Sequence, residues 1–296
     1  MELESRRNRR QNENGKRPDE QKPGEQKERK KKGKGDGDGE GKTPSRNRRI
    51  ILNILLVVCV GVFVFSAYML ISDYMEKQKA VGEYDDLTAH MAPLPEEGML
   101  YHNRKIDFEA LLLRNRDTVG WLWNPGTVID YPVVYSTDAF YYLEHTFSKA
   151  NNKTGAIFVD AGSSPDFTDR NTTIHGHHMK NGTMFASLEK YKDKAYYEEH
   201  PVMYLYTPEG TDEVVIFSSY VAHMEDPYTQ TAFPTEEEYQ SFLDGLKKRS
   251  AYAIEVEVTA QDRIITLSTC TYNYGDARLV VHGVLKPIEV GEPGDE

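Results

Sequence analysis

A thiol, a guanidinium and a cluster of imidazoles stand at separate points of this 296-residue chain. Cys270 ends the β-rich run Ile264-Ile265-Thr266-Leu267-Ser268-Thr269-Cys270, and Arg278 opens a second such run eight residues later. A nucleophile at the end of a strand is aimed by a rigid sheet. If the turn Tyr274-Gly275-Asp276 joins neighbouring strands, Arg278 returns beside Cys270, where a fixed cation could stabilise an oxyanion. Taken alone, Arg278 would be an ordinary charge at the end of a strand.

A thiol nucleophile also needs a base or an ion-pair partner, which is usually histidine. The nine histidines are concentrated only in Thr173-Ile174-His175-Gly176-His177-His178-Met179. On a strand, His175 and His177 would point to one face and His178 to the other. Zinc usually takes three or four ligands, and no other Cys or His pair is spaced to complete such a set. We expect no metal and no cofactor, and keep a metal-binding domain as an alternative hypothesis.

The cysteine count limits the further possibilities. There are only two cysteines, which excludes a disulfide framework, and Cys59 falls in an apolar run. Cys270 alone could be a buried small hydrophobic residue, an intermolecular bridge or a reactive nucleophile. A catalytically inactive anchoring or adaptor protein with a buried Cys270 is therefore a second alternative.

Charge divides the chain into two unlike parts. Residues 1–49 hold 17 Lys and Arg against 10 Asp and Glu, whereas the rest holds 19 against 37. The first part contains no aromatic residue and cannot bury enough apolar surface to form a folded domain. Its basic residues could attract anionic lipid or nucleic acid, but the interspersed acidic residues favour a solvated, disordered cytoplasmic tail. We expect no nucleic-acid partner.

A membrane anchor is predicted at residues 50–72, which carry no charge. At helical rise this stretch spans roughly 34 Å, against a hydrocarbon core of about 30 Å. A cleaved signal peptide would have a shorter apolar region, of about 7–15 residues. Arg46, Arg48 and Arg49 precede the stretch, and Asp73 and Glu76 follow it. The positive-inside bias places the N-terminus in the cytosol and the remainder outside the cell membrane.

The outer part reads as a helical connection followed by many short strands. Residues 73–104 form the predicted stalk, and residues 106–116 form a short helix. A hairpin is predicted over residues 119–134, with Asn124-Pro125-Gly126 as its turn. Further β-rich runs occupy residues 156–159, 172–175, 202–206, 214–221, 254–258, 264–268 and 279–285. Short strands separated by turn residues indicate a closed or nearly closed sheet.

Two longer helices interrupt the predicted strands. The first covers residues 183–199. The second follows Pro234, where Thr235-Glu236-Glu237-Glu238 forms a capping box. Its apolar residues recur at i, i+3, i+4 and i+7, and therefore share one face. They are Tyr239, Phe242, Leu243 and Leu246.

Several of these segments resemble the class B sortases, membrane-anchored cysteine transpeptidases of Gram-positive bacteria. Thr266-Leu267-Ser268-Thr269-Cys270 matches the TLxTC signature of sortases, and Arg278 falls where that family has its essential arginine. Gly176 to Phe185 is similar to the histidine segment of class B. The similarity extends to residues 119–121, 129–134, 142–145 and 155–160, and to the capped helix before the cysteine.

The resemblance implies a mainly β fold with added helices. It would be an eight-stranded β-barrel with N-terminal helices and a long helix between strands 6 and 7. We accordingly expect a tail (1–49), an anchor (50–72), a stalk (73–104), a catalytic domain (105–290) and a disordered C-terminus (291–296).

The resemblance also implies the site residues. Cys270 would be the nucleophile, and Arg278 the clamp for substrate and oxyanion. His177 would be the catalytic histidine, because the family's histidine directly follows a glycine. Ser268 and its neighbour Thr269 would line the substrate groove. This chain departs from its relatives at His175, where they often carry an aromatic or aliphatic residue. It also has Thr271 where many carry an acidic residue.

The implied partners are secreted proteins and the cell wall. A C-terminal sorting signal similar to NPxTx or LPxTG would be cleaved after its threonine, giving a thioacyl-enzyme. The acyl group would pass to an amine of a peptidoglycan stem peptide or cross-bridge, while residues 50–72 contact membrane lipid. Hydrolysis by water stays open as a side reaction.

Overall fold

The computed structural model describes residues 46–96, 99–223, 225–270 and 277–288. The tail up to residue 45, the turn of residues 274–276, Thr271 and the C-terminal segment 291–296 lie outside these residues.

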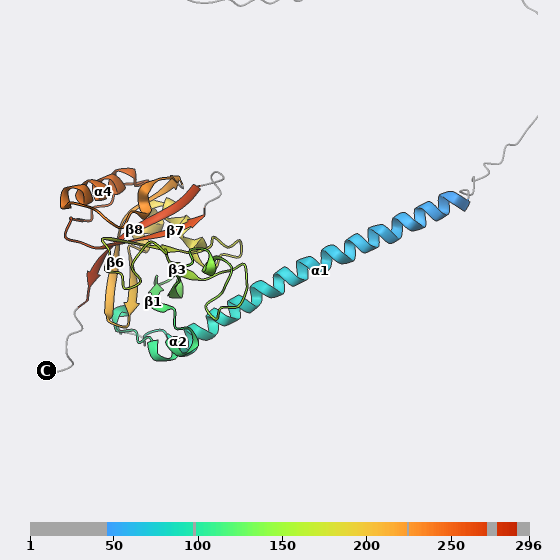
Figure 1. Cartoon of the computed structure of the whole chain (residues 1–296), viewed down its shortest axis with the longest axis horizontal. Coiled ribbons are helices and arrows are strands. Elements are labelled where there is room, and N and C mark those ends of the chain that lie inside the picture. Colours follow the sequence, from blue (N-terminus) through green and yellow to red (C-terminus); the bar gives the residue numbers. More distant parts are fainter. Residues whose placement is uncertain (1–45, 97–98, 224, 271–276, 289–296) are drawn as a thin grey trace, which may run out of the picture. The chain divides into compact units, whose positions relative to one another are not determined.

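Eight strands form one closed barrel, as the resemblance implied (Figure 1). The strands are β1 (Thr118–Trp123), β2 (Asp130–Tyr135), β3 (Ile157–Val159), β4 (Asn171–His175), β5 (Val202–Thr207), β6 (Gly210–His223), β7 (Ile264–Cys270) and β8 (Ala277–Pro287). Their order around the barrel is β1-β2-β3-β4-β7-β8-β6-β5, and β5 closes it onto β1. The pairs β2–β3 and β4–β7 are parallel, and the others are antiparallel.

Helices precede the barrel and interrupt its strands. They are α1 (Arg46–Met91), α2 (Phe108–Arg114), α3 (Lys194–Glu199) and α4 (Glu236–Arg249), with shorter 3-10 turns η1 (Tyr101–Asn103), η2 (Tyr141–Leu143), η3 (Phe185–Lys192) and η4 (Pro227–Thr229). The long helix between strands 6 and 7 is therefore α4, as expected.

The predicted hairpin is formed by β1 and β2. The two strands pair antiparallel, with Leu122 opposite Tyr131. Asn124 N–H donates to the Ile129 carbonyl at 2.8 Å. Gly126 has a φ of +76°, in the region that glycine adopts without steric cost. The turn chemistry read from the sequence thus corresponds to the observed connection.

Apolar residues form one core inside the barrel and a second core beneath α4. The interior core includes Leu122, Val133, Ile174 and Leu267. The second core joins the α4 face of Tyr239, Leu243 and Leu246 to residues of β6, β7 and β8 that include Phe217, Ile264 and Val280. Thr235 caps α4 by accepting a hydrogen bond from Glu238 N–H at 3.2 Å.

Two sequence predictions of secondary structure were wrong in part. Residues 254–258 alternate apolar and acidic side chains, but they form no strand. Ile254 and Val258 are buried among the two cores without entering the ladder, and Lys247 Nζ donates to the Val256 carbonyl. The helix predicted at residues 183–199 is divided into η3 and α3 at Asp193, which caps α3 through Ala195 N–H.

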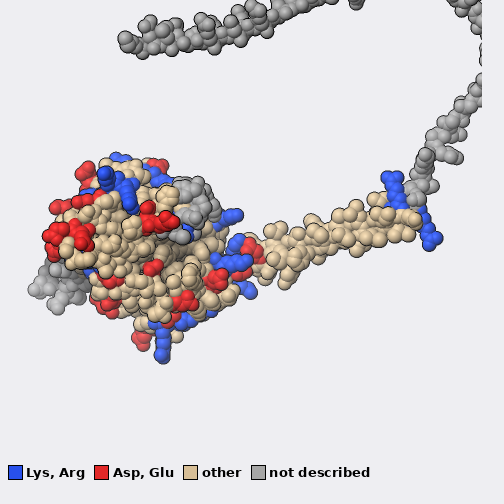
Figure 2. Space-filling view, turned by 45° about the horizontal axis from the view of Figure 1, so that its top comes forward, with Lys and Arg blue, Asp and Glu red and all other residues tan. Residues whose placement is uncertain are grey.

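The predicted anchor and stalk form one continuous helix. α1 runs through both segments and ends at Met91, two residues before Pro93. It is the one helix of the described residues that is long and apolar enough to cross a membrane. Figure 2 shows this stretch as a rod without charged side chains, with basic residues at its N-terminal end. These features are consistent with a membrane anchor.

Arg104 joins the end of α1 to the barrel through a buried ion pair. Its Nη1 and Nη2 lie 2.7 Å and 3.0 Å from the two carboxylate oxygens of Asp130. Arg104 also donates to the carbonyls of Ala92 and Pro93, and its guanidinium lies 4.6 Å from the centroid of the Trp123 ring. The side chain of Arg104 is fully buried.

We expect Arg104→Ala to lower the free energy of unfolding by about 3–5 kcal/mol, because it leaves the Asp130 carboxylate without its cation. Urea denaturation of the full-length protein in detergent measures this change. Arg114→Ala is the matched control, since Arg114 forms an exposed ion pair with Asp86 and should matter far less. Equal effects of the two substitutions would contradict a structural role for the buried pair.

Candidate active site

The ends of β7 and β8 bring two of the predicted site residues together. In the antiparallel register of these strands, Cys270 is paired with Arg278. The sequence prediction that the second strand returns Arg278 beside Cys270 is therefore confirmed for the backbone. The side chain of Cys270 lies outside the described part of the structure.

A cavity of about 420 Å³ opens at this end of the barrel. His177, Arg278, Ser268 and Thr269, all predicted site residues, contribute to its lining. Further lining residues come from the 3-10 segments and from β3 and β4: Ala139, Phe140, Leu143, Phe158, Asp160, His175, Gly176, Tyr228 and Thr229. Ser268 and Thr269 are nearly fully buried, whereas Arg278 is partly exposed.

The His177 ring is held from one side. Its Nε2 lies 2.8 Å from the carbonyl oxygen of Leu143. A carbonyl only accepts, so Nε2 carries the proton and Nδ1 is left to exchange one. Gly155, with a φ of +62°, packs so closely behind the ring that an added Cβ would lie 3.0 Å from His177 Cδ2 and 2.6 Å from the Tyr142 carbonyl. Only glycine fits this wall.

The neighbouring His178 lies elsewhere. β4 ends at His175, so the strand predicted for the whole histidine segment stops two residues before His177. His178 forms an isolated bridge with Met184, and its Nδ1 is 4.0 Å from Glu189. It contributes to a different cavity, of about 1110 Å³, which His177 does not line. The two adjacent imidazoles therefore serve separate surfaces.

His175 contributes to the same cavity as His177. Its Nε2 is 2.9 Å from the Asp160 carboxylate, and its ring centroid is 5.4 Å from that of Phe158. The hydrogen bond from His175 holds the pKa of Asp160 below its ordinary value, despite the opposing effect of burial. His175, His177 and His178 thus contact three different partners, and no group of metal-ligating side chains is found among the described residues.

A fourth imidazole is structural. His282 on β8 is completely buried, and its Nδ1 is 2.9 Å from the Thr266 hydroxyl. Burial, with a smaller contribution from Arg249, lowers the pKa of His282 to about 3. His282 is therefore uncharged at neutral pH and does not line the cavity.

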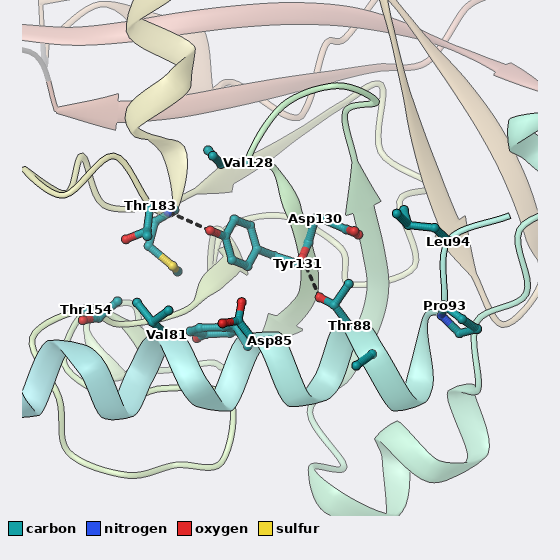
Figure 3. Close-up of a pocket in the computed structure, with 13 residues that line it drawn as sticks. Val81, Asp85, Thr88, Pro93, Leu94, Val128, Asp130, Tyr131, Thr154 and Thr183 are labelled. Carbon is teal, nitrogen blue, oxygen red and sulfur yellow. Dashed lines mark hydrogen bonds between the residues drawn. The ribbon is translucent and has the colours of Figure 1, made fainter.

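The C-terminal part of α1 supports the wall behind His177. The Tyr84 hydroxyl donates to the Gly155 carbonyl at 2.8 Å and accepts from Phe147 N–H at 3.3 Å. Figure 3 shows a second cavity, of about 470 Å³, between this helix and the barrel. There Met184 N–H donates to the Tyr131 hydroxyl, at the end of the loop that carries His177.

Sequence reasoning did not find these supporting contacts. Tyr84 was assigned only to a stalk, and Asp160 to a resemblance. The positive φ of Gly155 and the pairing of Asp160 with His175 depend on segments that meet only in the folded chain. No local pattern in the sequence could have identified them.

Comparisons with known proteins agree with this geometry. Residues 125–286 match the model of the Sortase domain. The chain is 35% identical to Sortase B of Listeria monocytogenes over 233 residues, covering 78% of this chain and 95% of that protein. It is 33% identical to Sortase B of Staphylococcus aureus over 242 residues, covering 81% and 96%.

Solved structures show the same relationship. A Staphylococcus aureus sortase B–substrate complex superposes with a TM-score of 0.63 at 30% identity, covering 73% of this chain and all of that chain. Sortase B from Bacillus anthracis in complex with AAEK1 gives 0.63 at 34% identity, covering 74% and 100%. The chain belongs to the class B sortases, and it is a sortase-type cysteine transpeptidase.

Proposed function

We propose that the protein cleaves a C-terminal sorting signal after its threonine and transfers the secreted protein to a peptidoglycan amine. The observation that carries this proposal is the single cavity lined by His177, Arg278, Ser268 and Thr269 at the strand pair of Cys270 and Arg278. Two relatives support the substrate classes, since one structure is a sortase B–substrate complex and another is sortase B complexed with triglycine.

In the first half-reaction, the Cys270 thiolate attacks the threonyl carbonyl. The carbon–sulfur bond forms, the oxyanion is stabilised by Arg278, and the carbon–nitrogen bond then breaks. A protonated His177 gives its Nδ1 proton to the leaving amine. A free cysteine has a pKa near about 8.5, so an ionised thiol at neutral pH needs the positive charge of His177 or Arg278 nearby.

In the second half-reaction, an acceptor amine attacks the thioester. Nδ1 of His177 accepts a proton from this amine, the new amide forms, and the thiolate leaves. Nε2 keeps its hydrogen bond to Leu143 throughout, which fixes the ring during both transfers. Water could replace the amine, so hydrolysis is the competing outcome.

We further propose that residues 50–72 span the cell membrane, with the N-terminus in the cytosol and the barrel outside. The apolar part of α1 and the arginines before it support this orientation. Such an arrangement would keep the enzyme where secreted proteins and cell-wall amines meet.

The proposal is tested by incubating the full-length protein in detergent with a library of sorting-signal peptides and candidate amines. Mass spectrometry should detect cleavage after threonine, an acyl adduct on Cys270 and an amide with one class of amine. A protein that cleaves peptides but forms only hydrolysis products with every amine would contradict the transferase assignment.

The two adjacent histidines provide a sharper prediction. We expect His177→Ala to lower kcat/KM by about 10²–10⁴, the usual contribution of a general acid and base. His178→Ala should be much milder, because His178 lines a different cavity. Peptide-cleavage kinetics of the two variants decide the matter, and the reverse order of severity would show that the wrong imidazole has been assigned.

A further inference from the structure

The substrate cavity contains a second imidazole that the proposed reaction does not use. His175 ends β4, where it is paired with Phe158 of β3 and with Ser268 of β7. Its side chain is 23% exposed and contributes to the cavity beside His177 and Arg278. The position therefore faces the peptide substrate under the function proposed above.

Asp160 fixes the direction of the His175 hydrogen bond. Asp160 Oδ1 accepts from Gly162 N–H at 2.8 Å, and Oδ2 lies 2.9 Å from His175 Nε2. The lowered pKa of Asp160 keeps this side chain ionised at neutral pH, so both of its oxygens only accept. The proton of the pair is consequently on Nε2 of His175.

The other ring nitrogen is then available to a ligand. In a neutral imidazole with the proton on Nε2, Nδ1 carries a lone pair and accepts hydrogen bonds. Nδ1 of His175 makes no hydrogen bond to any described residue, and it is not among their buried polar atoms without a partner. Phe158 packs against the ring and limits its rotation.

We propose that His175 is a specificity-determining residue that selects sorting peptides with a hydrogen-bond donor opposite Nδ1. Asp160 is its positioning residue, because it determines which nitrogen holds the proton. The inference rests on the proposed function, since it concerns the donor peptide of the same cavity. It names a substrate class: signals with an amide or hydroxyl side chain at the contacted position.

The polarity of this contact can be reversed by one substitution. In Asp160→Asn, Gly162 N–H keeps the amide oxygen on its own side, so the NH₂ group faces His175. Nε2 must then accept, and the proton moves to Nδ1, which becomes a donor. The variant is nearly identical in shape and should therefore prefer peptides that accept a hydrogen bond.

The test compares matched peptides at about pH 8, above the ordinary histidine pKa of about 6.5. Gln is exchanged for Glu, and Ser for O-methylserine, at each position before the threonine. We expect the wild-type protein to prefer Gln and Ser at one position by about threefold to tenfold in kcat/KM, the usual effect of one hydrogen bond. His175→Phe should remove this preference, and Asp160→Asn should invert the Gln–Glu preference.

Asp166→Asn is the control for charge, because it removes one exposed carboxylate from the same connection between β3 and β4. This carboxylate bonds only within its own turn, to Thr168. The substitution should leave the wild-type preference unchanged. Preferences that persist in His175→Phe, or that Asp166→Asn inverts equally, would overturn the inference while the proposed function stands. If the wild-type protein processes none of the peptides, the proposed function itself fails.

Discussion

Cys270→Ala is expected to abolish the acyl adduct and reduce peptide cleavage to the background rate. The reason is chemical: the proposed route forms a carbon–sulfur bond, and no other described residue at the cavity supplies a thiol. Intact-protein mass spectrometry of the full-length protein, quenched during turnover with a sorting-signal peptide, measures the adduct directly.

Cys59 provides the matched control for this experiment. It is the other cysteine of the chain and lies in the apolar part of α1. Cys59→Ala should retain the adduct and full turnover. An adduct of the same mass on the Cys270→Ala protein would refute the assignment of the nucleophile.

Arg278→Lys is expected to lower kcat by about 10²–10³, the usual cost of one lost oxyanion donor. Arg278 stands opposite Cys270 in the β7–β8 register and donates through Nη1 to the Ala277 carbonyl. A lysine retains the charge but cannot present a planar fork of donors to both backbone and substrate. Steady-state kinetics with a sorting-signal peptide measure the loss.

Arg263→Lys is a suitable comparison, because Arg263 precedes the neighbouring strand β7 and contacts the Phe167 carbonyl away from the cavity. It should change kcat little. An Arg278→Lys enzyme that works at the full rate would remove the clamp role, even if Arg278→Ala were inactive.

Local patterns were sufficient for those parts of the fold whose hydrogen bonds and burial agree. The Asn-Pro-Gly turn defines the β1–β2 hairpin, and the apolar stripe of Tyr239, Leu243 and Leu246 defines the buried face of α4. The short sequence separation of Cys270 and Arg278 restricts their strands to one antiparallel register. In each case neighbours in sequence are also partners in space.

The alternating pattern at residues 254–258 shows where this reasoning stops. Alternation reports which side chains are buried, and Ile254 and Val258 are indeed buried while Glu255 and Glu257 are exposed. It does not report whether the backbone pairs with another strand. In this segment Val256 accepts its hydrogen bond from the Lys247 side chain instead.

The environment of the histidines was also beyond the sequence. The choice between His177 and His178 rested on a resemblance, and the contacts that distinguish them come from Leu143 and Glu189. Tyr84 on α1 reaches the wall behind His177 across 71 positions of the chain. Such long-range contacts depend on the closed barrel and have no signature in the local sequence.

The rate of alkylation of Cys270 at neutral pH tests the central claim most directly. In full-length protein carrying Cys59→Ala, the one remaining thiol should react about tenfold or more faster than an ordinary cysteine, because nearby cations stabilise its thiolate. Replacing His177 with alanine should slow this reaction markedly, and His178→Ala should not. A thiol that reacts only after unfolding, or at the same rate in all these variants, would contradict the account.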